Sequence, residues 1–260
     1  MKKVIRRNIL KLINQFGYSI QRAPGGRRGN IAVELDDNDV DLIKYVFDSG
    51  YTMTSVPRLV NTLKSCRYVV ENNIPGDFVE CGVFRGGNCI LAKRLFEQLD
   101  ANRSIWMFDT FEGMTAPTEY DAKVGNKINV GQKFVESQRD GYNDWCYASL
   151  EDVKNNFLNS NLKLNRVNFI KGDVSETLKI KENIPSEIAI LRLDTDWYES
   201  TKSELGILYP ILSIGGVLIV DDYGTWKGSR KAVDEYFSTC DYKPLFNVID
   251  HSCRSAIKLK

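Results

Sequence analysis

The chain has 260 residues, of which 43% are apolar and 27% charged, and its net charge is +1. This length suits one α/β domain with extensions and supplies enough apolar residues for a sizeable core. No apolar run approaches the roughly 20 residues of a membrane span, and the N-terminus lacks a signal-peptide pattern, so we expect a cytoplasmic protein.

Charge is distributed unevenly along the chain. Residues 1–33 hold eight basic side chains and no acidic one, and subtracting these from +1 leaves −7 for residues 34–260. We expect no nucleic-acid partner for so acidic a body, because phosphate contacts need a basic surface. Six scattered cysteines without a CxxC pair argue against a zinc site, and the single histidine argues against Ser–His or Cys–His catalysis.

Residues 1–33 are predicted to form a basic amphipathic helix followed by a linker. Apolar residues between Val4 and Ile20 recur at helical spacing, with lysines and arginines between them. Two roles stay open for residues 1–22: peripheral contact with an anionic membrane surface, or packing on a second subunit of a homo-oligomer. Residues 34–76 are predicted as a helical N-terminal extension.

From residue 77 to residue 260, short strands rich in Val, Ile and Phe alternate with helical stretches near 88–100, 148–160, 199–212 and 229–239. The predicted strands are Phe78–Cys81, Ile105–Asp109, Val167–Lys171, Ile188–Asp194, Val217–Asp221, Leu245–Ile249 and Ala256–Leu259. This alternation predicts an α/β fold with a doubly wound, mostly parallel seven-stranded sheet. The last two strands have no helix between them and should form an antiparallel hairpin.

One long connection interrupts this alternation. Residues 110–147 have no clean period, yet they contain several aromatic side chains among Gly, Asn and Asp. A connection of this length inside a compact domain is often a lid or a binding loop. We therefore predict a lid-like insertion; the alternative is a disordered insertion, against which the aromatic residues argue.

A glycine-rich segment follows the first core strand and opens a helix. Its spacing is ExGxxxGG, formed by Glu80, Gly82, Gly86 and Gly87, with Arg85 before the glycine pair. Glycines let the backbone turn tightly and approach a ligand closely, and such a loop at a strand end in an open α/β sheet commonly holds a nucleotide-like cofactor. The missing GK[ST] sequence argues against a triphosphate site. The alternative is a purely structural turn.

Acidic residues also end the next two predicted strands. Asp109, followed by Thr110, lies 27 residues after Gly82 in the sequence, and a carboxylate there can accept hydrogen bonds from both ribose hydroxyl groups. Asp173, followed by Val174, could accept a hydrogen bond from an adenine amino group. The alternatives are a solvated acid for Asp109 and a helix cap for Asp173.

The most specific pattern is a pair of acidic motifs on successive apolar strands. Asp194 and Asp196 end one strand, and Asp221 and Asp222 end the next. Carboxylates crowded at one edge of a sheet repel each other unless a cation neutralises them. Oxygen ligands without Cys or His suit a hard divalent cation such as Mg²⁺. The alternative reading is a set of ordinary turn residues.

Together these segments resemble the macrocin (TylF-type) O-methyltransferase family and, more distantly, catechol methyltransferase. The resemblance runs from about Glu34 to Tyr236. It is densest at Met53–Ser55, Gly76–Val83, Arg85–Gly87, Asp109–Gly113, Leu193–Asp196, Tyr198–Thr201, Gly215–Val217 and Val220–Tyr223. It implies a Rossmann-like class I methyltransferase fold and an enzyme that uses S-adenosylmethionine.

The resemblance also implies roles for the candidate residues. By it, the loop formed by Glu80, Gly82, Arg85, Gly86 and Gly87 holds the methionine part of the cofactor, Asp109 and Thr110 the ribose, and Asp173 and Val174 the adenine side. Asp194, Asp221 and Asp222 match the family's metal ligands, while Asp196 could be a ligand or a neighbour of the ligands. The implied acceptor is a small molecule or glycan with a sugar hydroxyl group.

The general base is left open by the sequence. Some family members use a histidine in the long central loop, but residues 110–150 contain none. The proton of the acceptor could pass to water, to a carboxylate such as Asp194, or to His251. The other readings are an NAD-dependent oxidoreductase, against which the missing GxGxxG and the acidic pairs argue, and a non-catalytic nucleotide- or glycan-binding protein of the same fold.

Overall fold

The structure is a computed structural model that describes residues 32–125 and 128–260. The helix predicted for residues 1–22, and nearly all of the linker after it, lie outside the described residues. The chain divides into two compact units, residues 1–36 and residues 37–260, and the second contains every element described below. No helix in the described ranges is long and apolar enough to cross a membrane.

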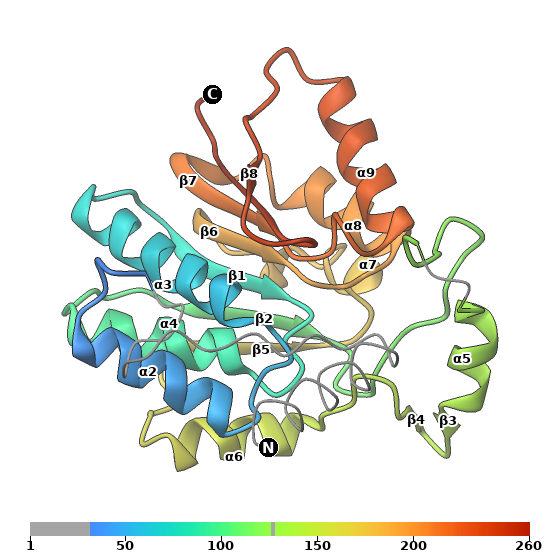
Figure 1. The fold of residues 1–260 in the computed structure, drawn as a ribbon, viewed down its shortest axis with the longest axis horizontal. Helices are drawn as coiled ribbons and strands as arrows, with labels where there is room; N and C mark the ends of the chain where they lie inside the picture. Colours follow the sequence, from blue (N-terminus) through green and yellow to red (C-terminus); the bar gives the residue numbers. More distant parts are fainter. Residues whose placement is uncertain (1–31, 126–127) are drawn as a thin grey trace, which may run out of the picture. The chain divides into compact units, whose positions relative to one another are not determined.

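The core is a seven-stranded sheet, which confirms the predicted fold class (Figure 1). Its spatial order is β5 (Val167–Lys171), β2 (Ile105–Asp109), β1 (Asp77–Cys81), β6 (Ile188–Leu193), β7 (Leu212–Val220), β9 (Arg254–Ile257) and β8 (Asn247–Val248). The first five are parallel, and β6 is buried along its whole length because it lies at the centre with helices on both faces.

The last two strands form the predicted antiparallel hairpin, with β9 inserted between β7 and β8. β8 is shorter than the predicted Leu245–Ile249, because only Asn247 and Val248 pair with β9. Leu245 lies before the strand and is exposed. β9 begins two residues earlier than predicted. The turn between them, residues 249–253, reaches back toward the carboxyl edge of the sheet.

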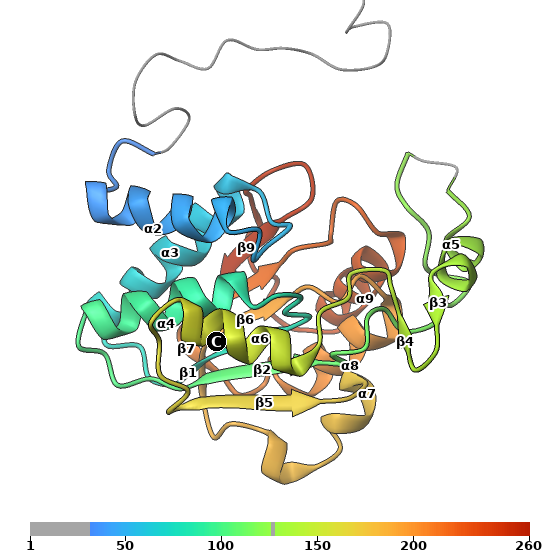
Figure 2. The same ribbon diagram turned by 90° about the horizontal axis from the view of Figure 1, so that it is seen from below.

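Helices cover both faces of the sheet (Figures 1 and 2). α3 (Val56–Glu71), α4 (Gly87–Gln98) and α6 (Leu150–Asn159) lie on one face; α7 (Val174–Thr177), α8 (Tyr198–Ile207) and α9 (Lys227–Ser238) lie on the other. α6 begins where Ser149 and Asp152 form a capping box, each side chain accepting a hydrogen bond from the other residue's backbone N–H.

The helical segment before the sheet is part of the same compact unit as the sheet. α2 (Asp37–Asp48) packs on α3 and α4, and α3 also contacts β6 and β7. The amphipathic pattern of α2 explains this packing, because its apolar side chains Val40, Leu42, Ile43 and Val46 are buried. The loop between α2 and α3, residues 49–55, thereby reaches the carboxyl edge of the sheet.

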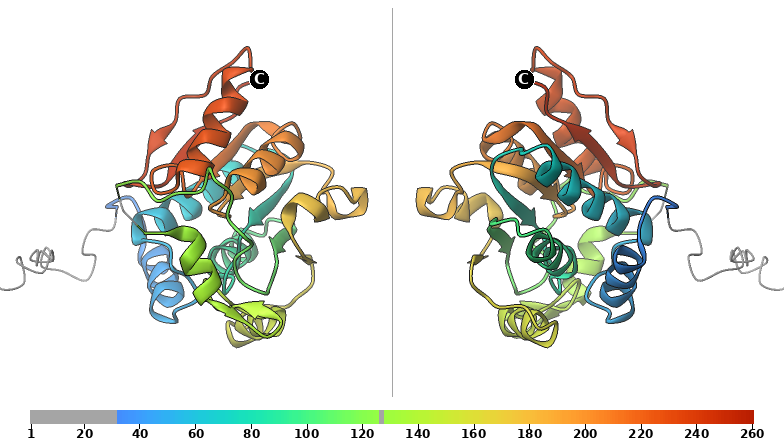
Figure 3. Two further views of the ribbon diagram at one scale, coloured as in Figure 1. Left: turned by 90° about the vertical axis from the view of Figure 1, so that its right-hand side faces the viewer. Right: turned by 90° about the vertical axis from the view of Figure 1, so that its left-hand side faces the viewer.

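The described parts of the insertion, residues 110–125 and 128–147, lie at that same edge and contain folded elements (Figures 1 and 3). They contain α5 (Val130–Glu136) and a small hairpin of β3 (Gln138–Arg139) and β4 (Tyr142–Asn143). The sequence pattern predicted none of these short elements. Trp145 of this segment packs against Trp197 and Trp226, with ring centroids 5.6 and 6.1 Å away, so the aromatic residues attach the insertion to the start of α8 and α9.

Candidate active site

The aspartates singled out in the sequence end or follow strands at the carboxyl edge, and Glu80 lies within β1, one residue before its end. Asp109 ends β2, Asp194 follows β6, and Asp221 and Asp222 follow β7. β6 and β7 are neighbours, with Leu193 opposite Val220, so the acids after them emerge side by side. Gly82 follows β1 with φ +80°, and a Cβ there would collide with the backbone carbonyl of Asp194. Only glycine fits this position between the strands.

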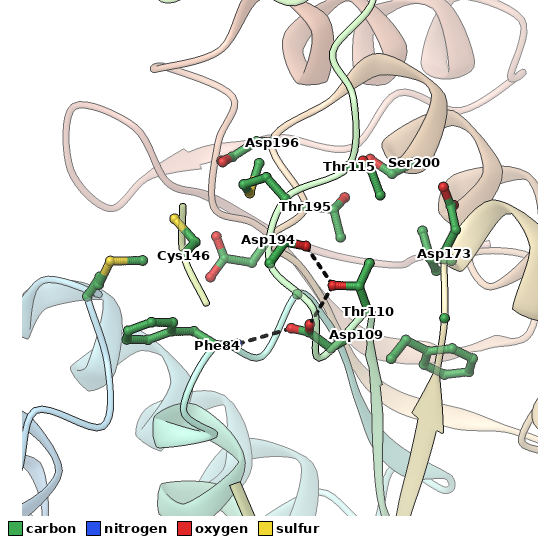
Figure 4. A pocket seen from close by; sticks show the side chains of 17 residues that line it. Phe84, Asp109, Thr110, Thr115, Cys146, Asp173, Asp194, Thr195, Asp196 and Ser200 are labelled. Carbon is green, nitrogen blue, oxygen red and sulfur yellow. Dashed lines mark hydrogen bonds between the residues drawn. The ribbon is translucent and has the colours of Figure 1, made fainter. Parts of the chain in front are cut away.

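Two cavities open along this edge. The first cavity contains five of the predicted cofactor residues: Gly82, Asp109, Thr110, Asp173 and Val174. Its remaining walls come largely from the insertion and from the start of α8, through Gly113, Met114, Thr115, Cys146 and Ser200. In Figure 4, Asp194 and Asp196 lie on the same side of this cavity as Phe84 and Cys146, and Asp173 lies on the other.

The second cavity is polar and contains the acidic cluster. Asp194, Asp196, Asp221 and Asp222 line it together with polar side chains of the loop after α2 and of α3 and α4, among them Thr52, Thr54, Arg58 and Asn88. The two cavities share four lining residues, which are Met53, Phe84, Asp194 and Asp196. A group transferred from a molecule in one cavity to a molecule in the other would therefore pass these four side chains.

Asp109 holds the glycine loop in shape. Its Oδ2 accepts hydrogen bonds from the backbone N–H groups of Val83 at 2.7 Å and Phe84 at 3.2 Å, and its Oδ1 accepts one from Phe111 at 2.8 Å. Burial raises the pKa of the Asp109 carboxyl, and these hydrogen bonds oppose the rise. The carboxylate lines the first cavity while it joins the loop after β1 to the insertion after β2.

The other residues predicted for the glycine loop do not line the first cavity. Glu80 is buried and lines the second cavity; its Oε1 lies 3.1 Å from Nη1 of Arg192, and its Oε2 accepts a hydrogen bond from the Cys89 thiol at 2.8 Å. Burial raises the pKa of Glu80 to about 7. Arg85 is exposed, and Gly86 and Gly87 line neither cavity.

Asp173 caps a helix as well as lining the first cavity. Its Oδ1 accepts hydrogen bonds from the backbone N–H of Ser175 at 2.8 Å and from the Ser175 hydroxyl at 2.6 Å. The structure thus confirms that Asp173 caps a helix, the alternative role predicted for it, and also places it in the wall of the first cavity. Val174, the first residue of α7, is buried and contributes an apolar surface to the cavity.

Asp194, Asp221 and Asp222 approach one another closely enough to share one cation. Each offers a carboxylate oxygen, and these oxygens lie within 4.8 Å of one another. Burial raises the pKa of Asp221 to about 7 and that of Asp222 well above its ordinary value. Asp196 lies beside them with φ +67°, its backbone N–H donating to Oδ2 of Asp222 at 3.1 Å, and burial raises its pKa to about 7.

Two arginines in this cluster were not singled out in the sequence. Arg192, the next-to-last residue of β6, is fully buried and pairs with Glu80, Asp194 and Asp221. Arg58, on α3, pairs with Asp221 and, through Nε at 2.7 Å, with Asp250 in the turn after β8. An arginine inside an apolar strand, two residues before an acid, was the available signal for Arg192. Arg58 gave none, because the partners of a helix are set by tertiary packing.

His251, a candidate base, is exposed in the turn between β8 and β9 and lines neither cavity. Its neighbour Asp250 reaches the cluster through Arg58, and the hydroxyl group of Ser252 donates to the backbone carbonyl of Asp221 at 2.8 Å. The six cysteines are all free, in keeping with the absence of a CxxC pattern.

Comparison with known proteins gives this site a family. The model of the macrocin O-methyltransferase (TylF) family matches residues 32–255, which contain both cavities and the acidic cluster. The chain belongs to the macrocin O-methyltransferase family. It is therefore a class I S-adenosylmethionine-dependent O-methyltransferase, as the resemblance implied, and the oxidoreductase reading is dropped.

Two curated relatives are also named as O-methyltransferases. This O-methyltransferase is 36% identical over 204 residues to demethyldecarbamoylnovobiocin O-methyltransferase of Streptomyces niveus, covering 78% of this chain and 73% of that one. It is 34% identical over 191 residues to mycinamicin III 3''-O-methyltransferase of Micromonospora griseorubida, covering 72% and 70%.

Solved structures agree with the fold. The O-methyltransferase NovP superposes with a TM-score of 0.74 at 30% identity, over 86% of this chain and 98% of that one. The calicheamicin methyltransferase CalS11 superposes with a TM-score of 0.57 at 18% identity, over 92% and 99%, which supports the fold alone.

Proposed function

We propose that this O-methyltransferase uses a divalent cation such as Mg²⁺ and methylates a hydroxyl group of a sugar, on a glycosylated small molecule or a glycan precursor. The observation that carries the proposal is the meeting of the two cavities at Asp194 and Asp196. A methyl donor in the first cavity and a hydroxyl group in the second would face each other across this boundary.

The first cavity suits S-adenosylmethionine by the chemistry of its walls. Asp109 and Asp173 present carboxylates to hydroxyl and amino groups, while Phe84, Met114 and Val174 supply apolar surface for the adenine ring and the carbon chain. The bound cofactor would supply an electrophilic methyl group. Gly82 and Asp109 would fix its orientation, because displacement at carbon requires oxygen, methyl and sulfur to lie in line.

The acidic cluster suits a hard cation. Asp194, Asp221 and Asp222 offer only oxygen ligands. Arg192 and Arg58 pair with Asp194 and Asp221 but not with the buried Asp222, so a positive charge beside Asp222 would relieve the repulsion among the three carboxylates. A divalent cation held there would lower the pKa of an acceptor hydroxyl group and could bind two vicinal hydroxyl groups at once. The three carboxylates would set the position of the acceptor beside the first cavity.

Asp196 is the residue we assign as the proton acceptor. It lines both cavities, so its carboxylate lies at the boundary where the acceptor hydroxyl group must lose its proton. Its backbone N–H bonds to Asp222, which holds it against the cluster. We leave His251 out of the proposed chemistry, because an exposed side chain that lines neither cavity has no path to the hydroxyl group.

The relatives support a sugar acceptor. A relative from Streptomyces olivaceus, 35% identical over 189 residues, is named as the 4'-O-methyltransferase of a tetracenomycin C that carries an α-L-rhamnosyl group. The polar wall of the second cavity agrees with this class. Thr54 accepts hydrogen bonds from Asn88 and Arg192, both at 3.3 Å, which leaves its own hydroxyl proton to donate to an acceptor oxygen.

The decisive experiment separates the cofactor from the cation. Calorimetry with S-adenosylhomocysteine tests the first cavity, and we expect binding without added metal. Transfer of a labelled methyl group to a panel of rhamnosides, with and without EDTA, then tests the cluster. We expect transfer to stop with EDTA and to return with Mg²⁺.

Two variants provide the controls. Asp222→Asn should abolish transfer while it leaves S-adenosylhomocysteine affinity unchanged, because Asp222 lines only the second cavity. Asp234→Asn, on the exposed side of α9, should change neither. Failure to bind S-adenosylhomocysteine would overturn the proposal for the first cavity, and transfer that persists in EDTA would overturn the role of the cation.

The peripheral membrane contact predicted for residues 1–22 is kept as a separate proposal. Sedimentation with anionic liposomes, comparing the full chain with one that begins at residue 23, tests it. Equal sedimentation of the two proteins would remove it and favour a role for the helix in a homo-oligomer.

A further inference from the structure

We propose that Arg58 is an exchangeable counter-ion of the acidic cluster: it occupies the Asp221 carboxylate until a divalent cation binds there, and Asp250 then retains it at the edge of the second cavity. This inference rests on the cation proposed above. It assigns a function to a residue of α3 that neither the motifs nor the relatives' names point to.

The first step in the argument is that both oxygens of Asp221 are already in use. Oδ1 pairs with Nη2 of Arg192, and Oδ2 pairs with Nη1 of Arg58. The carboxylate is 5% exposed, so the two guanidinium groups replace nearly all of its contact with water. A cation that takes Asp221 as a ligand would share an oxygen with one of these guanidinium groups, and the repulsion between two positive charges at a buried carboxylate favours displacement of that arginine.

The two arginines differ in their freedom to leave. Arg192 has no exposed side-chain surface, and besides Asp221 it pairs with Glu80 and Asp194, so its removal would strand buried carboxylates. Arg58 is 13% exposed and lines the second cavity. When Arg58 leaves Asp221, the carboxylate keeps a positive neighbour, because the incoming cation takes the place of the guanidinium group. Arg58 is the partner that can exchange.

The second anchor of Arg58 is built to retain it. Oδ2 of Asp250 accepts a hydrogen bond from Nε of Arg58 at 2.7 Å and another from the Ser55 hydroxyl at 2.8 Å. Oδ1 of Asp250 is fixed by the backbone N–H groups of Ser252 at 2.9 Å and Cys253 at 2.8 Å. Three of these four donors are independent of Arg58, so Asp250 keeps its place when Arg58 moves, and Nη1 can leave Asp221 while Nε stays bound.

These contacts place Arg58 between two competing carboxylates, and opposite effects of two substitutions follow. Arg58→Gln removes the competitor for Asp221 and should raise the affinity for Mn²⁺ by about tenfold, the effect of one hydrogen bond between charged groups. Asp250→Asn weakens the retaining anchor, leaves Arg58 to Asp221, and should lower the affinity for Mn²⁺ severalfold. The asparagine keeps an oxygen for the N–H groups of Ser252 and Cys253.

The experiment is a titration of the full-length protein with Mn²⁺. Binding is measured by calorimetry and, independently, by the electron paramagnetic resonance signal of free Mn²⁺. Charge alone would also give opposite signs, so the double variant R58Q/D250N decides. If Asp250 acts through Arg58, D250N should have almost no effect in the R58Q background. An equal effect of D250N in both backgrounds would show that Asp250 acts only by its long-range charge, and would overturn the inference.

Two further measurements keep the test independent of folding and of the proposed function. R58Q should lower the melting temperature of the metal-free protein, yet Mn²⁺ should raise its melting temperature more than it raises that of the wild type. R58K keeps one charge without bridging both carboxylates, and its affinity should fall between those of the wild type and R58Q. Suppose that the wild type binds Mn²⁺ and the D222N variant does not, so that the cation site is established. An affinity of R58Q for Mn²⁺ that is lower than or equal to that of the wild type would then overturn the inference about Arg58 and leave the cation site standing. No binding by the wild type would overturn the cation site itself.

Discussion

Nη1 of Arg192 lies 2.6 Å from Oδ2 of Asp194, two residues further along the chain at the end of β6. Alternate residues of a strand project to the same face, so this spacing brings the guanidinium group and the carboxylate together. The same guanidinium group reaches Glu80 on β1 and Asp221 after β7. One buried arginine therefore joins three neighbouring strands at the edge where both cavities open.

Replacing this arginine should destabilise the protein strongly. Arg192→Met keeps much of the side-chain volume but leaves three carboxylates without their shared cation, and we expect the free energy of unfolding to fall by about 3–5 kcal/mol. Urea unfolding followed by circular dichroism measures this. Arg139→Met, which breaks an exposed ion pair with Asp144, is the matched control and should cost less than about 1 kcal/mol. Similar losses in the two variants would contradict the role of Arg192.

The five parallel strands could be predicted from the sequence because each is an apolar run that ends at, or just before, a glycine or an acid. β2 and β5 have the predicted bounds, and β6 differs by one residue. The elements within residues 110–147 could not be predicted, because α5, β3 and β4 are too short to show a period. Val130 of α5 and Trp145, which follows β4, pack in one apolar cluster with Trp197 and Trp226, which lie far away in the sequence.

The candidate site was predicted in part for the same kind of reason. Strand ends place Asp194, Asp221 and Asp222 together, and the topology of a parallel sheet makes that visible in the sequence. The sequence also predicts that positive charge must lie beside these carboxylates, but it does not show that two arginines supply part of that charge. In the structure Arg192 and Arg58 balance the cluster. Their pairing depends on side-chain reach and on the docking of α3, neither of which leaves a pattern in the sequence.

Asp109→Asn should lower the affinity for the cofactor strongly and the free energy of unfolding only slightly. The amide keeps one acceptor oxygen, so the backbone N–H groups of either Val83 or Phe111 would face an NH₂ group in place of a carboxylate. We expect S-adenosylhomocysteine affinity to fall by about ten- to a hundredfold, the effect of one or two hydrogen bonds to a charged group. Calorimetry measures it. Glu112→Gln, an exposed acid of the same loop, should leave the affinity unchanged.

The insertion should loosen when its buried anchor is removed. Oδ1 of Asp121 accepts a hydrogen bond from the backbone N–H of Tyr198 at 2.9 Å, and Oδ2 accepts one from that of Thr118 at 2.8 Å. Asp121→Ala leaves both donors without a partner, so we expect faster hydrogen exchange across residues 115–125. Affinity for S-adenosylhomocysteine should fall with it, because Thr115 lines the first cavity.

Hydrogen-exchange mass spectrometry with and without S-adenosylhomocysteine measures this effect on the insertion. Glu119→Ala changes an exposed acid two residues away and is the matched control. We expect the ligand to slow exchange in the wild type and in E119A, and to do so less in D121A. Exchange in D121A that matches the wild type would show that the aromatic contacts of the insertion suffice to hold it.

A buried carboxyl group beneath the first cavity should give the protein a measurable pH dependence. Glu204, on α8, is fully buried; its Oε1 accepts a hydrogen bond from the Thr195 hydroxyl at 2.9 Å, and the thiol of Cys81 lies beside its carboxyl group. Burial raises the pKa of Glu204 from 4.5 to about 8. The folded protein therefore holds a proton there over a pH range in which the unfolded chain has released it.

The sign of the effect follows from this difference. Between about pH 5 and pH 8 the folded state binds more protons than the unfolded state, so the stability contributed by the neutral carboxyl is present at low pH and is lost as pH rises. The side chain introduced by Glu204→Gln cannot titrate. As pH rises from 5 to 8, the free energy of unfolding of this variant should therefore fall less steeply than that of the wild type. The two slopes should differ by about 1.4 kcal/mol per pH unit, the value for one proton. The comparison with the wild type isolates Glu204 from the other buried acids. Urea unfolding at pH 5, 6, 7 and 8 measures both slopes, and parallel slopes would show that Glu204 ionises in the folded protein as it does in the unfolded chain.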